Sequence, residues 1–129
     1  MSSPTFIVIA QFTTFLGAAI FIAKILDDKK ALDVTVLKVE QSSSVWEYFV
    51  IATGQSNTQI KALANEVEAK LEEKEERPLH IEGYASCEWV LMDYNDVNVN
   101  IFQEESRMFY SLERLWSDAT EVNAEELLK

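Results

Sequence analysis

The stretch from residue 82 to residue 116 reads EGYASCEWVLMDYNDVNVNIFQEESRMFYSLERLW, and it decides the fold of this 129-residue chain. Two segments in it alternate between apolar and polar residues, which is the pattern of β-strands with one face on a core. Tyr94-Asn95 lies between them, and asparagine tolerates the positive φ that a two-residue turn requires. The sequence therefore predicts a hairpin that a helix follows directly. Its predicted cross-strand pairs are Asp93–Asp96, Met92–Val97, Leu91–Asn98, Val90–Val99 and Trp89–Asn100.

The alternation assigns every side chain of this hairpin to one of two faces. The first face is apolar and is expected to be core, with Met92, Val97, Val90 and Val99. The second face mixes a tryptophan and a leucine with acids and amides, and an upstream hairpin turning at Tyr84-Ala85 would extend it to His80. With the turn included, the candidate partner-binding residues are Glu82, Trp89, Leu91, Asp93, Tyr94, Asp96, Asn98 and Asn100.

The pattern of this second face allows two interpretations. A solvated outer face of a sheet often carries isolated apolar residues, because apolar atoms contribute much of any protein surface. A docking face for another protein instead combines an aromatic anchor with a polar rim, as Trp89 and the neighbouring carboxylates would here.

The rest of the chain predicts further strands at Asp33–Val39, Trp46–Thr53 and Leu79–Gly83. The apolar run within the second of these indicates a central strand that is covered on both sides. Ser56 is expected to cap a helix, with Gln59 reaching back to its start. The apolar residues of that helix follow at helical spacing and are Ile60, Leu63, Ala64, Val67 and Leu71.

A last helix is expected over Glu104–Ser117, with Phe109, Leu112 and Trp116 facing inward and Arg107 in an ion pair with Glu104 or a sheet carboxylate. The fold class is therefore α/β (α+β), a single domain whose mixed five-stranded sheet is packed by about three helices on one face. The other face, which bears Trp89, is expected to be partly open. The expected organisation is an apolar N-terminal part (1–23), the domain proper (24–118) and an acidic C-terminal tail (119–129).

Composition narrows the classes of function. The formal net charge is −11, which argues against direct nucleic-acid binding, because that requires lysine and arginine to displace counterions from phosphates. A basic protein partner is electrostatically favoured. The chain has one cysteine and one histidine, which excludes an internal disulfide and a multi-histidine metal site. No cofactor or metal is expected, and the lone cysteine is typical of a reducing, cytoplasmic location.

Several short motifs occur together in this chain: Asp28-Lys29-Lys30-Ala31, Tyr48-Phe49-Val50-Ile51, Thr53-Gly54-Gln55-Ser56, Glu82-Gly83, Trp89-Val90-Leu91, Asp93-Tyr94, Asp96-Val97, Ile101-Phe102, Glu105, Arg107, Phe109, Tyr110, Leu112, Glu113, Leu115 and Trp116. Their order and spacing, over about residues 24–118, resemble the ribosomal silencing factor family, also called Iojap-like. Four positions depart from the usual family pattern. They are Glu47 for aspartate, Asn95 for glycine, Asn98 for an apolar residue and Asn100 for histidine.

The resemblance implies a nucleotidyltransferase-like topology without established enzymatic activity. It also implies binding to the large ribosomal subunit through a basic ribosomal protein, number fourteen of that subunit. The bound domain would block the small subunit from joining and so repress translation. An open face that bears Trp89 also allows a homodimer in the absence of ribosomes.

Two alternative functions come from other segments. The strand that ends at Gly54-Gln55-Ser56 and leads into a helix is similar to the phosphate-holding loop of Mg-dependent nucleotidyltransferases. That chemistry needs two carboxylates on one strand, and the strand after this helix offers only Glu82, so no enzyme is expected. Residues 2–23 carry no charge and are long enough to span a bilayer. They could be the anchor of a membrane-tethered adaptor, a segment at an oligomer contact, or the extension that leads into a first helix at Phe15–Asp28, which the resemblance favours.

Overall fold

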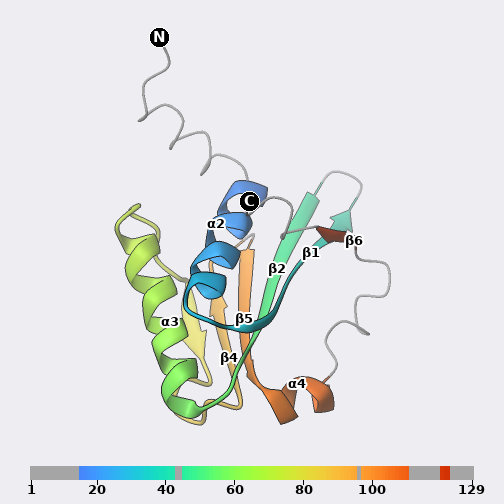
Figure 1. Cartoon of the computed structure of the whole chain (residues 1–129). Helices are drawn as coiled ribbons and strands as arrows, with labels where there is room; N and C mark the ends of the chain where they lie inside the picture. The colour runs from blue at the N-terminus through green and yellow to red at the C-terminus, as the bar shows by residue number, and fades with distance from the viewer. Residues whose placement is uncertain (1–14, 43–44, 96, 111–119, 123–129) are drawn as a thin grey trace.

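The computed structural model describes residues 15–42, 45–95, 97–110 and 120–122. Its elements follow one another along the chain from an N-terminal helix to a short last strand (Figure 1). They are α2 (Phe15–Asp28), β1 (Leu32–Ser42), β2 (Val45–Gly54), α3 (Asn57–Glu72), β3 (His80–Glu82), β4 (Trp89–Asp93), β5 (Val97–Gln103), α4 (Glu104–Tyr110) and β6 (Thr120–Val122).

The strands form one mixed sheet in the order β3-β4-β5-β2-β1-β6. The pair β2–β5 is parallel, and the other neighbours are antiparallel. The predicted fold class, a single α+β domain with a mixed sheet, is confirmed. The sixth strand was not predicted: Thr120–Val122 pairs with β1, within the segment that the sequence suggested to be an acidic C-terminal tail.

Helices α2 and α3 lie together on one face of this sheet (Figure 1). The prediction of a first helix at Phe15–Asp28 is confirmed, and Ala19, Ile22, Ala23 and Leu26 pack against the sheet. Among the described residues, no helix is both long enough and apolar enough to cross a membrane. Residues 1–14, and with them most of the uncharged N-terminal run, lie outside the described ranges.

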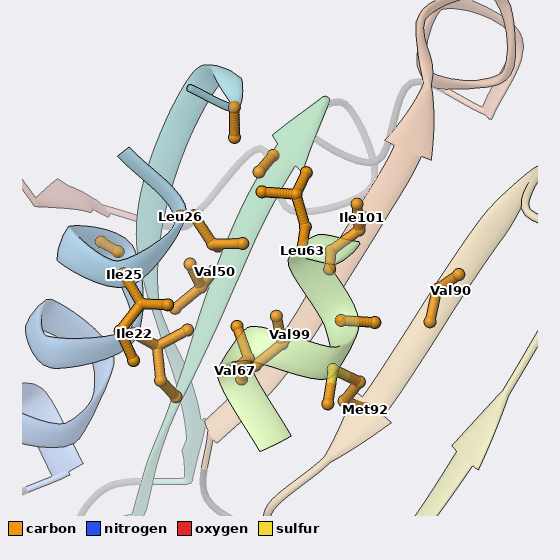
Figure 2. Packing of buried hydrophobic residues seen from close by; sticks show 14 of the residues in the cluster. Ile22, Ile25, Leu26, Val50, Leu63, Val67, Val90, Met92, Val99 and Ile101 are labelled. Carbon is orange, nitrogen blue, oxygen red and sulfur yellow. The ribbon is translucent and has the colours of Figure 1, made fainter. Parts of the chain in front are cut away.

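The main core lies between the two helices and the sheet. Figure 2 shows side chains of α2, such as Ile22 and Leu26, and of α3, such as Leu63 and Val67, directed toward the central strands. Val50 of β2 and Val99 of β5 are completely buried there. The predicted core residues of the hairpin, Val90, Met92, Val97 and Val99, all belong to this core.

The start of α3 is fixed by side chains that accept from backbone amides. Ser56 is the N-cap, and its Oγ accepts from the backbone N–H of Gln59 at 3.1 Å. Gln59 reaches back as predicted, and its Oε1 accepts from the backbone N–H of Gln55 at 2.6 Å. Its Nε2 donates to the carbonyl of Lys30, which ties the start of α3 to the turn that follows α2. The five apolar residues predicted for this helix are its five buried residues.

The last helix, α4, is described over Glu104–Tyr110, so the inward positions predicted for Leu112 and Trp116 lie outside the described residues, and the side chain of Phe109 is not described either. Arg107 was expected to bind a carboxylate. The structure places its guanidinium on strand oxygens, where it donates to the carbonyl of Asp33 at 2.6 Å and to Thr53 Oγ1 at 3.0 Å. It also donates to Thr35 Oγ1, so this side chain joins α4 to both β1 and β2.

The N-cap gives a direct stability test. We expect Ser56→Ala to lower the free energy of unfolding by about 1 kcal/mol, because the amide of Gln59 loses its acceptor at the helix start. Urea denaturation followed by circular dichroism measures the change. Thr58→Ala, at an exposed position in the first turn, is the matched control and should leave stability nearly unchanged. Equal losses in the two variants would contradict the capping role.

Candidate functional site

The hairpin of β4 and β5 carries most of the candidate site, and its register differs from the prediction. The structure pairs Trp89 with Phe102 and Asp93 with Asn98, a shift of two residues. The reason lies at the turn, where the Asp93 carboxylate accepts from the Asn95 amide at 2.8 Å. Pairing therefore continues to Tyr94, whose N–H donates to the Val97 carbonyl, and the turn moves one residue onward. The positive φ predicted for Asn95 is confirmed at 75°.

A shift of two residues leaves every side chain on its predicted face. The second face of the sheet, opposite α2 and α3, therefore does carry Trp89, Leu91 and Asp93. Strand β3 extends it as expected, because His80 pairs with Asp93 and Glu82 pairs with Leu91.

The middle of this second face is buried, contrary to the expectation of a partly open surface. A second apolar cluster fills it, with Leu37, Ile51 and Phe102 buried and Phe49 and Trp89 packed against them. Asn98 and Asn100 also lie within the buried part, at 9% and 2% exposure. The prediction that these two asparagines contact a partner is therefore corrected, because neither side chain is accessible.

The indole of Trp89 is held in place by the strand beside it. Its ring stacks on Phe102, with 5.1 Å between centroids and 24° between planes. Its Nε1 donates to Asn100 Oδ1 at 2.9 Å. The side chain stays half-buried, so the ring is held on one side by protein and is partly accessible. The role of Phe102 was missed because the predicted register placed it beyond the hairpin pairs.

Gly83 sets the approach of β3 to the start of β4. Its φ is +80°, and a Cβ at this position would collide with the carbonyl oxygen of Trp89. Only glycine allows this backbone path without strain, because it lacks the Cβ and readily adopts positive φ. The backbone of Trp89 is thereby fixed as well as its ring. The link to β4 is longer than the predicted turn at Tyr84-Ala85, since β3 ends at Glu82 and β4 begins at Trp89.

Accessible residues of the second face lie on the edge strand β3 and on β4 beside it. His80 and Glu82 are exposed, and Leu91 and Asp93 are partly exposed. The imidazole of His80 lies between two carboxylates, with Nε2 at 3.2 Å from Glu82 Oε2 and Nδ1 at 3.7 Å from Asp93 Oδ2. We call these four residues together with Trp89 the edge surface.

Tyr94 does not join this surface in the structure. Tyr94 packs against the main core on the helix side, and its buried hydroxyl has no hydrogen-bond partner among the residues that the structure describes. Burial raises the pKa of this phenol well above its usual range, and Glu68 and Glu76 raise it further. That Tyr94 contacts a partner stays a prediction, because the side chain is only half-buried. Asp96 lies outside the described residues.

The loop at the start of α3 was the other candidate site, for phosphate. Its amides at Gln55 and Gln59 already donate to side-chain oxygens of the same segment, and the Ser56 hydroxyl serves as the cap. Glu82 is the one carboxylate that the sequence offered for nucleotidyltransferase chemistry, and it lies beside His80. Within the ranges that the structure describes, no group of three or more histidine, cysteine, aspartate or glutamate side chains is arranged to hold a metal ion.

Comparison with known proteins shows the family to which this chain belongs. Residues 14–129 match the family model described as "Ribosomal silencing factor during starvation". The chain is 40% identical to the ribosomal silencing factor RsfS of Bacillus subtilis over 93 residues, which cover 72% of this chain and 79% of that protein. It is 37% identical to the protein of the same name from Halalkalibacterium halodurans, over 80% of this chain and 88% of the relative.

Solved structures agree with the fold. A crystal structure of a protein from Chromobacterium violaceum superposes with a TM-score of 0.75 at 36% identity, covering 81% of this chain and 87% of the other. A second, from Bacillus halodurans, has a TM-score of 0.68 at 34% identity and covers 84% and 95% of the two chains.

Removal of the buried Tyr94 hydroxyl tests whether this group stabilises the core. We expect Tyr94→Phe to leave the free energy of unfolding unchanged or to raise it by about 1 kcal/mol, because it removes a buried polar group that has no partner within the described ranges. Urea denaturation measures this. A loss of more than about 1 kcal/mol would show that the hydroxyl makes a stabilising hydrogen bond after all.

The contact between Asn100 and Trp89 can be observed directly. We expect Asn100→Ala to lower the free energy of unfolding by about 1–3 kcal/mol, because the half-buried indole N–H loses its acceptor. In the ¹H–¹⁵N spectrum the Trp89 indole signal should move and exchange faster with D₂O, and its absence in Trp89→Phe assigns it. An unchanged indole signal in the folded alanine variant would contradict the contact.

Proposed function

Because the chain belongs to the ribosomal silencing factor family, we propose that it represses translation by binding the large ribosomal subunit and blocking the small subunit from joining. Its partner there is a basic ribosomal protein, number fourteen of the large subunit. The observation that carries this proposal is the edge surface: an indole held by Phe102 and Asn100 beside the accessible carboxylates of Glu82 and Asp93.

The chemistry of the edge surface supports a protein partner. A rigid aromatic ring contributes a large contact area with little loss of conformational entropy on binding, which is why tryptophan is enriched among residues that dominate binding energy. Leu91 lies between Trp89 and Asp93 along β4, directly opposite Glu82 of β3, and adds apolar contact. Glu82 and Asp93 face lysine and arginine of the partner, and the net charge of −11 steers a basic surface toward the protein.

The mechanism is steric and needs no chemical step. A bound domain occupies the space into which the small subunit would move, so repression depends only on affinity and position. A nucleotidyltransferase-like activity has less support, because the amides at the start of α3 are taken up by Ser56 and Gln59. We place the protein in the cytoplasm with its ribosomes. When ribosomes are scarce, the edge surface is available for a homodimer.

Co-sedimentation with purified large subunits tests this function. We expect wild-type protein to bind, and binding to weaken as salt rises from about 0.05 to 0.3 M, because exposed charges are screened. Glu82→Lys should weaken binding about tenfold or more, since it places a positive charge against a basic partner. Trp89→Ala, if circular dichroism shows it folded, should lose most of the affinity through loss of the aromatic contact.

The matched control is Glu73→Lys, an exposed position at the end of α3 and therefore remote from the second face. It carries the same change of net charge as Glu82→Lys, so any effect of overall charge appears in both variants. Equal weakening by the two lysine variants would refute a role for the edge surface. Failure of the wild-type protein to bind large subunits at low salt would refute the function itself.

A further inference from the structure

His80 lies where the edge surface would meet its partner, yet its imidazole already faces the two carboxylates proposed to bind that partner. Its Nε2 is 3.2 Å from Glu82 and its Nδ1 is 3.7 Å from Asp93. It is the only histidine in the chain. In the part of the chain that the structure describes, β3 is an edge strand with β4 as its one neighbour. Glu82 faces the ring from its own strand and Asp93 faces it from β4.

From this juxtaposition we propose that His80 is a proton-controlled competitor for the carboxylates of the edge surface, so that docking on the basic partner weakens as the pH falls. This inference rests on the proposed function and describes its regulation. Neutral imidazole leaves Glu82 and Asp93 with their full charge for lysine or arginine of the partner. Protonated imidazole pairs with both carboxylates and lowers the negative charge of the surface by one unit.

The direction of the pH effect depends on whether the neutral or the protonated form of His80 binds the basic partner more tightly. Histidine is the side chain whose charge most readily changes near physiological pH, so a pH step can compare the two forms of this surface. Protonation adds a positive charge to a surface that must approach positive charges, so the protonated form binds more weakly. By linkage, a bound basic partner in turn disfavours protonation of His80.

The size of the effect is limited by exposure. The side chains of His80 and Glu82 are 50% and 65% exposed, and that of Asp93 is 24% exposed. Ion pairs between exposed groups are weak, so two of them change an affinity by about three- to tenfold and not by orders of magnitude. That is enough to alter occupancy when the concentration of the protein is near its Kd.

The experiment measures the Kd for large subunits by co-sedimentation at about pH 8 and about pH 6, at constant ionic strength, with the full chain. We expect the wild-type Kd to rise about three- to tenfold at the lower pH. His80→Gln removes the titrating group, so its Kd should hardly differ between the two pH values, whatever its Kd at the higher pH. Its residual pH dependence reports the contribution of the ribosome.

His80→Lys supplies a permanent positive charge at the same place and should bind weakly at both pH values. Asn65→Lys, at an exposed position of α3 on the other side of the sheet, adds the same charge elsewhere and should bind like wild type. If wild type and His80→Gln have the same pH dependence, the inference fails while the proposed function stands. If wild type binds at neither pH, the proposed function fails and the inference with it.

Discussion

The parallel pairing of β5 with β2 fixes where the other elements of this protein can lie. Parallel neighbours need a crossover connection, and here α3, β3 and β4 together form it between the two strands. β5 is thereby inserted next to β2, and β4 and β3 are carried outward to the edge. The accessible edge surface is thus a consequence of a central pair that is itself buried.

The same pairing places two asparagines in the interior. Period-two alternation in β5 directs Val99 and Ile101 into the main core, and it directs Asn98, Asn100 and Phe102 into the second cluster. A buried amide costs free energy unless it is hydrogen-bonded. Asn100 meets this requirement by accepting from Trp89 and donating to the carbonyl of Asn98. The buried side-chain amide of Asn100 therefore orients the Trp89 indole, because the amide must keep this hydrogen bond.

Much of this could be read from the sequence, because alternation assigns faces regardless of exact register. Trp89, Leu91 and Asp93 were placed on the correct face although the hairpin pairs were displaced by two residues. The displacement came from a local hydrogen bond, in which the backbone N–H of Asn95 donates to the Asp93 carboxylate. This bond competes with the turn suggested by residue type. Burial was harder to predict than the face of each side chain. Alternation places Asn98 and Asn100 on the second face but does not tell whether other residues cover them. Strand β6 escaped prediction because three residues carry too little pattern to identify a strand.

Burial of β5 also changes what kind of interface the edge surface can make. Its accessible side chains come from two short strands, so apolar contact area is limited to Trp89, Leu91 and their surroundings. A small interface gains affinity only if a few groups are well placed before binding, because area alone does not set affinity. The stack on Phe102 and the fixed backbone at Gly83 supply that placement for the indole. Acidic groups around it then determine which partners approach, since a surface this negative repels phosphate and attracts basic protein.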